Sequence, residues 1–193
     1  MVADPVKFEK RRSASREDWL LATLEVLRER GIEGVKVVAI ARRLGLTSGS
    51  FYWHFKNIQD LLDDVLNYWE QIQTGHIIED ALAFKGPPEE RIRNLMHQVI
   101  AEDASRPDSA VAVWAKSDAR AAACYNRAMQ RRFEFSSWLF EQAGFERNDA
   151  EIRGRMMVMT LMGETTAGLK ERKGWKNILD AHWKILMQRD EVS

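Results

Sequence analysis

The sequence predicts an all-α protein of about nine helices, with a small N-terminal head of three helices and a larger helical body. Three observations support this prediction. Apolar residues recur every three or four positions in nearly every segment, no strand candidate extends beyond a few residues, and glycines and four prolines separate the periodic segments. The composition agrees, because 45% apolar and 30% charged residues in a chain of 193 are typical of a globular protein with a buried core.

The N-terminal head is expected to hold three short helices. The first begins after a capping residue, Ser15, and ends at Gly31. A second helix is expected over about 37–44. Thr47 is expected to cap a third helix over about 48–55. The apolar face of the first helix carries Trp19, Leu20, Thr23, Val26 and Leu27.

The body is expected to contain six further helices, which places the domain boundary between 1–58 and 59–193. Asn57 and Asp60 are expected to cap a long helix that bends or loosens at Gly75. The remaining helices are expected over about 92–100, 107–114 and 118–142, and from near residues 148 and 175.

The 29 basic and 29 acidic residues balance over the whole chain but not within its two parts. Residues 1–58 contain 11 basic and 7 acidic side chains, whereas residues 59–193 contain 18 and 22. This asymmetry indicates that the head and the body meet different partners. An arm at 7–16 holds five basic side chains and one acidic one, which is typical of a segment that neutralises phosphates; a solvated terminus with no partner is the alternative.

Residues 40–51 carry the most informative motif. Ala41 allows two helices to approach closely, and Gly45 permits the positive φ of a tight turn between them. This spacing is typical of a helix-turn-helix unit, whose second helix enters the major groove of DNA. The small core between the two helices is expected to contain Ile40, Leu44, Leu46 and Phe51.

Polar groups along this unit and the arm are the candidate DNA contacts. The second helix is poor in charge, so hydroxyls, one imidazole and contacts with thymine methyl groups are expected to read the bases. Packing within the head is the alternative for Tyr52 and His54, and Phe51 and Phe55 are assigned to the core. The candidate DNA contacts are Arg11, Arg12, Arg16, Lys36, Thr47, Ser48, Ser50, Tyr52, Trp53, His54 and Lys56.

The run Phe-Tyr-Trp-His-Phe-Lys-Asn at 51–57, followed by Asp-Leu-Leu at 60–62, resembles the signature of the TetR family of transcriptional repressors. The resemblance covers about 19–62 and extends loosely over the nine-helix layout. It implies a homodimer that binds a roughly palindromic double-stranded DNA operator and a small-molecule effector. Lys36 stands where the family usually has Thr, and Ile58 where it usually has Lys, so Lys36, Lys56 and the arm are expected to hold phosphates instead.

Large apolar side chains with a few polar tips predict a ligand cavity in the body. An ordinary filled core is the alternative for each residue alone, whereas the family resemblance implies a cavity between these helices. No buried pair of cations is evident, so a small apolar or aromatic effector is expected. The candidate pocket residues are Met96, His97, Ile100, Trp114, Tyr125, Met129 and Phe133.

An apolar stripe with small residues follows the last two helices. Exposed on a monomer, such a stripe would promote aggregation, so a four-helix interface between two copies is expected. Methionines at this spacing are read as packing residues in preference to metal ligands. The candidate interface residues are Ile152, Met156, Met159, Gly163, Trp175, Leu179, His182 and Leu186.

Enzymatic chemistry is disfavoured. Tyr52 and Lys56 have the spacing of a dehydrogenase proton relay, but the sequence has no glycine-rich dinucleotide fingerprint and no nucleophile elbow. The four histidines stand far apart, so neither a metal nor another cofactor is expected.

Two function hypotheses remain. The first is a ligand-responsive repressor that an effector releases from its operator. The second is a helical small-molecule binding or scaffold protein without operator binding. The single cysteine, Cys124, is expected to be a small buried residue. The lack of a secretory signal and of an apolar stretch of eighteen residues predicts a cytoplasmic protein with no membrane partner.

Overall fold

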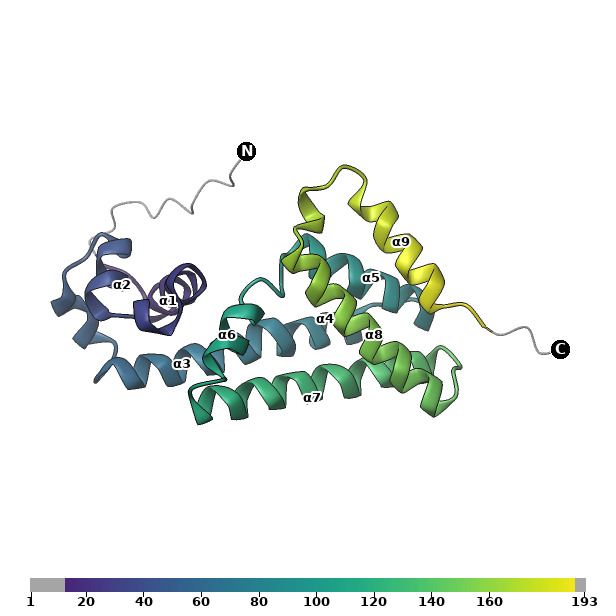
Figure 1. The fold of residues 1–193 in the computed structure, drawn as a ribbon, viewed down its shortest axis with the longest axis horizontal. Coiled ribbons are helices and arrows are strands. Elements are labelled where there is room, and N and C mark those ends of the chain that lie inside the picture. The colour runs from purple at the N-terminus through teal and green to yellow at the C-terminus, as the bar shows by residue number, and fades with distance from the viewer. Residues whose placement is uncertain (1–12, 190–193) are drawn as a thin grey trace.

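The computed structural model describes residues 13–189, and within that range it contains helices and no strand (Figure 1). The all-α prediction is confirmed. None of the helices in this range is both long and apolar enough to cross a membrane. The α-helices are α1 (Arg16–Arg30), α2 (Val37–Leu44), α3 (Ile58–Glu70), α4 (Ile77–Ala83), α5 (Pro88–Ala101), α6 (Asp108–Trp114), α7 (Ala119–Gln142), α8 (Arg147–Thr166) and α9 (Trp175–Leu186). Shorter segments are the 3-10 helices η1 (Ile32–Gly34), η2 (Ser48–Trp53) and η4 (Leu169–Glu171), and the π-helix η3 (Gln71–His76).

Two of the predicted helix starts are confirmed in atomic detail. At α1 the Ser15 hydroxyl accepts from the Asp18 amide at 3.1 Å, while the Asp18 carboxylate accepts from the Ser15 amide at 2.8 Å. At α3 the Asn57 side chain accepts from the Asp60 amide at 3.0 Å. Both caps satisfy amides that have no partner within the first turn of their helix.

The third helix of the head differs from its prediction. Residues 48–53 form a 3-10 helix in place of an α-helix, and the Thr47 side chain makes no capping hydrogen bond to a backbone amide. Its hydroxyl lies 3.3 Å from the Ser50 hydroxyl instead. Gly49 and the serines around it have low helix propensity, so the packing of the buried Phe51 decides the local geometry.

One long helical axis connects the head to the body (Figure 1). It consists of α3, η3 and α4 in succession, with helical backbone angles at both junctions. The predicted loosening at Gly75 is confirmed, because this residue lies inside the π-helical segment η3. Such π-helical turns are frequently found at functional sites.

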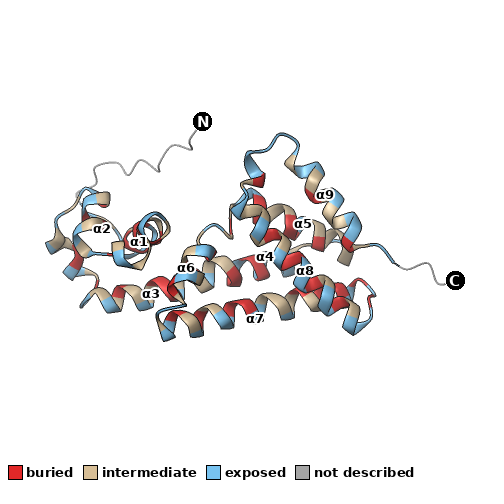
Figure 2. Cartoon of the chain, viewed as in Figure 1, coloured by how far each residue is buried: buried red, intermediate tan, exposed pale blue. Residues whose placement is uncertain are grey.

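Two hydrophobic clusters form the core. The first joins the head to α3, the start of α7 and α6, whose Val111 and Trp114 pack in the same cluster as Trp19. The second joins α5, the end of α7, α8 and α9. Figure 2 shows buried residues along α3 and α7, which lie side by side. The first cluster extends past residue 58, so the head and α6 share buried side chains across the predicted boundary.

The helices α7 and α8 form a hairpin that packs most closely at Gly154. A Cβ atom added there would lie 2.6 Å from the backbone nitrogen of Ser137 and 3.0 Å from its Cα atom. Backbone cannot move aside as a side chain can, so this contact requires glycine.

Replacing Gly154 with valine is expected to lower the free energy of unfolding by about 1–3 kcal/mol through overpacking. Urea unfolding followed by circular dichroism measures the change. Glu151→Val, at an exposed position of the same helix and outside the apolar stripe, is the control with the same introduced side chain. Equal stability of Gly154→Val and wild type would contradict the proposed packing.

Candidate DNA interface and ligand pocket

Buried aromatic rings hold the second helix of the helix-turn-helix unit in place. Phe51 contacts Trp19 edge to face, with ring centroids 5.5 Å apart, and stacks on Phe55 at 5.3 Å. All three side chains are buried, as predicted for Phe51 and Phe55. Gly45 provides the turn before this helix, with a left-handed φ of 70°. The rings therefore fix which side of η2 faces outward.

Tyr52 and Trp53 lie on that outward side. Tyr52 is 67% exposed and Trp53 is 87% exposed, so neither packs in the core of the head. Thr47 is exposed, and Ser48, Ser50 and His54 are partly exposed. The structure thus places the predicted reading residues together on one short segment, with the Thr47 and Ser50 hydroxyls 3.3 Å apart.

The residues predicted to contact phosphate differ in whether their charges are already paired within the chain. Lys36 and Lys56 are exposed and form no ion pair within the described residues. Arg16 is already engaged inside the chain: it pairs with Asp64 at 2.6 Å, donates to the carbonyl of His54 and covers the Phe55 ring. Arg16 therefore ties α1 to α3. Arg11 and Arg12 lie outside the described residues.

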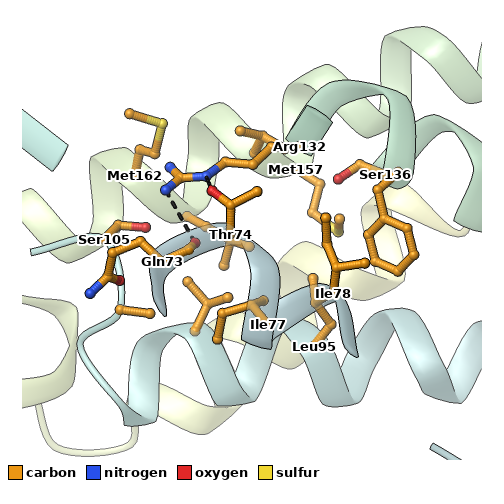
Figure 3. A pocket seen from close by; sticks show the side chains of 15 residues that line it. Gln73, Thr74, Ile77, Ile78, Leu95, Ser105, Arg132, Ser136, Met157 and Met162 are labelled. Carbon is orange, nitrogen blue, oxygen red and sulfur yellow. Dashed lines mark hydrogen bonds between the residues drawn. The ribbon is translucent and has the colours of Figure 1, made fainter. Parts of the chain in front are cut away.

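A cavity of about 50 Å³ lies in the body between η3, α4, α5, α7 and α8, with the segment after α5 at its edge (Figure 3). This volume is small beside the roughly 150 Å³ of an apolar cavity that binds benzene. The residues that line it are Gln73, Thr74, Ile77, Ile78, Leu95, Val99, Ala104, Ser105, Arg132, Phe135, Ser136, Met157, Val158, Leu161 and Met162.

None of the seven predicted pocket residues lines this cavity, although it lies against some of the same helices. Met96, Ile100 and Trp114 are fully buried and fill the core. Tyr125 stacks on Trp69 at 6.0 Å, and Met129 is buried. Each of these residues presents a different helix face from the one that borders the cavity.

The other two predicted pocket residues make contacts elsewhere. Phe133 faces a polar groove between α7 and α8, where the Arg155 guanidinium covers its ring at 4.3 Å. His97 lies 2.8 Å from Asp180 of α9. Arg93 donates twice to the same carboxylate and, together with His97, holds the pKa of Asp180 well below its usual range. His97 therefore clamps α5 to α9 and is not a polar anchor of the cavity.

A buried ionic network borders the cavity on the side of the π-helical segment. Arg132 of α7 donates to Asp108 of α6 at 2.6 Å and to the Thr74 hydroxyl at 2.9 Å. Its second terminal nitrogen donates to the Gln73 carbonyl, as Figure 3 shows. The Trp69 indole donates to Asp108 at 3.0 Å. The network links α3, η3, α6 and α7, and the pairing of Arg132 with Asp108 leaves no net charge there.

The outer face of α8 is an apolar stripe that no part of residues 13–189 covers. Ile152, Met156 and Met159 are each more than half exposed, and Gly163 continues the stripe at the next helical spacing. The face that packs on α7 is the opposite one, with Gly154 and Met157 buried.

The predicted interface residues of α9 are placed differently. Leu179 and Leu186 are buried in the second core cluster of the same chain, so they are not available to a partner. Trp175 and His182 are half-buried, and His182 lies 3.7 Å from Glu164 of α8. The prediction was wrong for the two leucines because their helix turns its apolar side toward α5.

The cysteine is buried, as predicted. Its thiol donates to the Glu70 carboxylate at 3.3 Å, and burial is the main factor that raises the pKa of Cys124 to about 12. A thiol with this pKa stays protonated and unreactive at neutral pH.

Comparison with known proteins agrees with the geometry of the head. Residues 20–65 match the family model described as "Bacterial regulatory proteins, tetR family". Tetracycline repressor protein class D of Escherichia coli is 43% identical over 49 residues, which cover 25% of this chain and 22% of that protein. The HTH-type transcriptional regulator AcrR of Shigella flexneri is 27% identical over 97 residues, which cover 49% and 44%.

Similarity of fold extends much further along the chain. The fatty acid degradation regulator FadR from Bacillus halodurans superposes with a TM-score of 0.69 at 17% identity, covering 92% of this chain and 96% of that one. The sequence matches, in contrast, span less than half the length of the two curated relatives.

The head of this chain is similar in sequence to the TetR family of bacterial regulatory proteins over residues 20–65, which agrees with the resemblance found in its sequence. The chain as a whole has the all-α fold of the solved regulators that superpose on it.

Proposed function

We propose that this protein is a homodimeric transcriptional repressor that a small, mainly apolar effector releases from a roughly palindromic DNA operator. One observation carries the proposal. The buried rings of Trp19, Phe51 and Phe55 hold η2 so that Tyr52 and Trp53 project from the head and stay 67% and 87% exposed, with the Tyr52 ring resting edge to face on Phe51. Exposed aromatic and hydroxyl groups on a rigid helix are suited to contact bases and phosphates in a major groove.

Different residues of the head have different roles in this proposal. Lys36 and Lys56 hold phosphates and position the head without reading sequence. Thr47, Ser48 and Ser50 lie at the groove and discriminate between bases. Arg16 positions the head by joining α1 to α3, and the basic arm before it adds phosphate contacts.

Lys56→Ala is expected to weaken binding to all DNA sequences and to reduce the slope of log affinity against log salt by about 1. Ser50→Ala is expected to change the preference among operator variants. Fluorescence anisotropy with DNA flanking the protein's own gene measures both effects. Lys85→Ala, an exposed lysine of the body, is the control and should leave affinity unchanged. Equal affinity of wild type and a Tyr52→Ala, Lys56→Ala double variant would refute these roles.

The exposed stripe of α8 is the proposed dimer interface. Methionines adapt to a facing surface, and Gly163 would let a partner helix approach closely, since no atom of the described residues lies within 4 Å of a Cβ atom placed there. A second copy with the same stripe would bury both surfaces around a two-fold axis. This arrangement would present two heads to two half-sites of one operator.

The ionic network offers a route from the cavity to the head. Arg132, Thr74 and Gln73 border the cavity, and Asp108 begins α6, which shares a core cluster with the head. An effector that favours one position of α6 and of the long helix would favour one separation of the two heads. Coupling of roughly 1–3 kcal/mol would change operator affinity about 5- to 150-fold.

A further inference from the structure

We infer that the cavity selects an uncharged effector with an apolar body and a hydroxyl group, and that it discriminates against carboxylates and against quaternary ammonium ions. The biological meaning of this selection rests on the proposed function, whereas the selection itself is a property of the cavity and can be measured without DNA.

The walls of the cavity favour an apolar body. Aliphatic and aromatic side chains from four helices form most of its surface, among them Ile77, Leu95, Phe135 and Leu161. Met157 and Met162 also line it, and unbranched methionine side chains can change rotamer to make room. Because the cavity holds only about 50 Å³, a larger effector must displace these side chains.

The charge balance at the cavity disfavours an acid. Arg132 is the one charged side chain among the lining residues, and Asp108 already neutralises it at 2.6 Å. The side chains of this pair are 11% and 2% exposed. A carboxylate would have to compete with Asp108 for the guanidinium and would place a second negative charge beside it in a poorly solvated space.

The same balance disfavours a cation. Within the described part of the chain, no aspartate or glutamate lines the cavity, so a quaternary ammonium group would lose its hydration without gaining an adjacent counter-ion. Arg132 would also repel it. An uncharged group avoids both penalties.

Polar side-chain atoms at the cavity that lack hydrogen-bond partners indicate that the effector carries a hydroxyl group. The side-chain oxygen Oε1 of Gln73 is buried and accepts no hydrogen bond within the described part of the chain. Ser136 is buried at the cavity, and none of the hydrogen bonds found among residues 13–189 uses its hydroxyl. Figure 3 shows Gln73 on the side of Arg132 and Ser136 on the opposite side. Oε1 is covered in this conformation, so an effector that turns the Gln73 side chain toward the cavity could donate its hydroxyl to an acceptor that is otherwise unpaired.

The experiment compares four eight-carbon probes with the full chain: 1-octanol, octane, octanoate and octyltrimethylammonium. Isothermal titration calorimetry at pH 7.5 measures each dissociation constant. We expect 1-octanol to bind at least tenfold more tightly than either ion, and about two- to tenfold more tightly than octane. Octanoate or the ammonium ion binding as tightly as 1-octanol would overturn the inference, and so would the failure of all four to bind.

Two variants test whether Gln73 accepts a hydrogen bond from the hydroxyl of the probe. Gln73→Leu is expected to remove the preference for 1-octanol over octane, while thermal stability stays the same or rises because a buried unpaired oxygen is lost. Gln71→Leu, at an exposed position of the same π-helical segment, should keep the preference. A preference that survives in Gln73→Leu would refute the role of Gln73.

Operator binding of the same samples separates this inference from the proposed function. If the chain binds operator but shows no preference for 1-octanol, the inference fails and the DNA-binding proposal stands. If the preference holds but no DNA is bound, the inference stands and the repressor proposal fails.

Discussion

Asp108→Ala is expected to lower the free energy of unfolding by about 3–5 kcal/mol, because it leaves the Arg132 guanidinium buried without its counter-ion. The loss also removes the acceptor of the Trp69 indole, which lies 3.0 Å away. Asp108 and Arg132 connect α6 with α7. We therefore expect the whole cooperative unfolding transition to shift to a lower urea concentration. Circular dichroism during urea unfolding measures the change.

A double-mutant cycle tests whether the charge pair is responsible. Arg132→Met combined with Asp108→Asn should recover a large part of the stability that Asp108→Asn alone loses, since replacing both charges leaves no buried charge unpaired. A loss below about 1 kcal/mol in Asp108→Ala, or strictly additive losses in the cycle, would contradict a buried and coupled pair.

Met156→Glu combined with Met159→Glu is expected to separate the proposed dimer and to weaken operator binding by about 10²–10⁴-fold. Two charges placed in the apolar stripe would have to be desolvated at the interface. A monomer offers one head to the operator and loses the gain that comes from linking two binding units. Sedimentation velocity and fluorescence anisotropy measure the two effects.

Leu82→Glu is the matched control for this prediction. Leu82 is about as exposed as Met156 but lies on α4, away from the stripe. It should leave both the dimer and DNA binding unchanged. A folded wild-type monomer at micromolar concentration, or a double variant that remains dimeric, would refute the assignment of the interface to α8.

Features that depend on neighbouring residues in the sequence could be predicted. The caps at Ser15 and Asn57 follow from a polar side chain placed three residues before an amide. The turn at Gly45 follows from the one residue type that adopts positive φ without strain. The apolar period also identifies Phe51 and Phe55 as core residues. For these reasons the fold class and the helix-turn-helix unit were accessible from sequence.

The cavity could not be predicted because its lining depends on how the helices rotate against one another. Leu95 and Met96 are adjacent and equally apolar, yet Leu95 lines the cavity and Met96 fills the core. The role of Arg132 could not be predicted, because its partner Asp108 lies 24 residues away in the sequence. The position of Arg132 three residues after Met129 places it on the buried side of α7, and this spacing is the one indication of its role in the sequence.

The exposure of the apolar residues proposed for the interface could be predicted in part, for a similar reason. Ile152, Met156 and Met159 are apolar and remain exposed because the other side of α8 packs on α7 through Gly154. Leu179 has the same apolar character, but α9 packs on α5 and buries it. Sequence periodicity shows that a helix has an apolar face, whereas only the packing shows which faces are already covered.

The salt dependence of operator binding tests the central claim most directly. Fluorescence anisotropy with DNA flanking the protein's own gene, from about 50 to 200 mM salt, gives the slope of log affinity against log salt. A regulator that neutralises several phosphates with its lysines and arm should lose affinity steeply and linearly on this scale, by about 0.9 per phosphate contacted. No binding at low salt, or binding that salt does not weaken, would contradict the account and favour a helical small-molecule binding protein without operator binding.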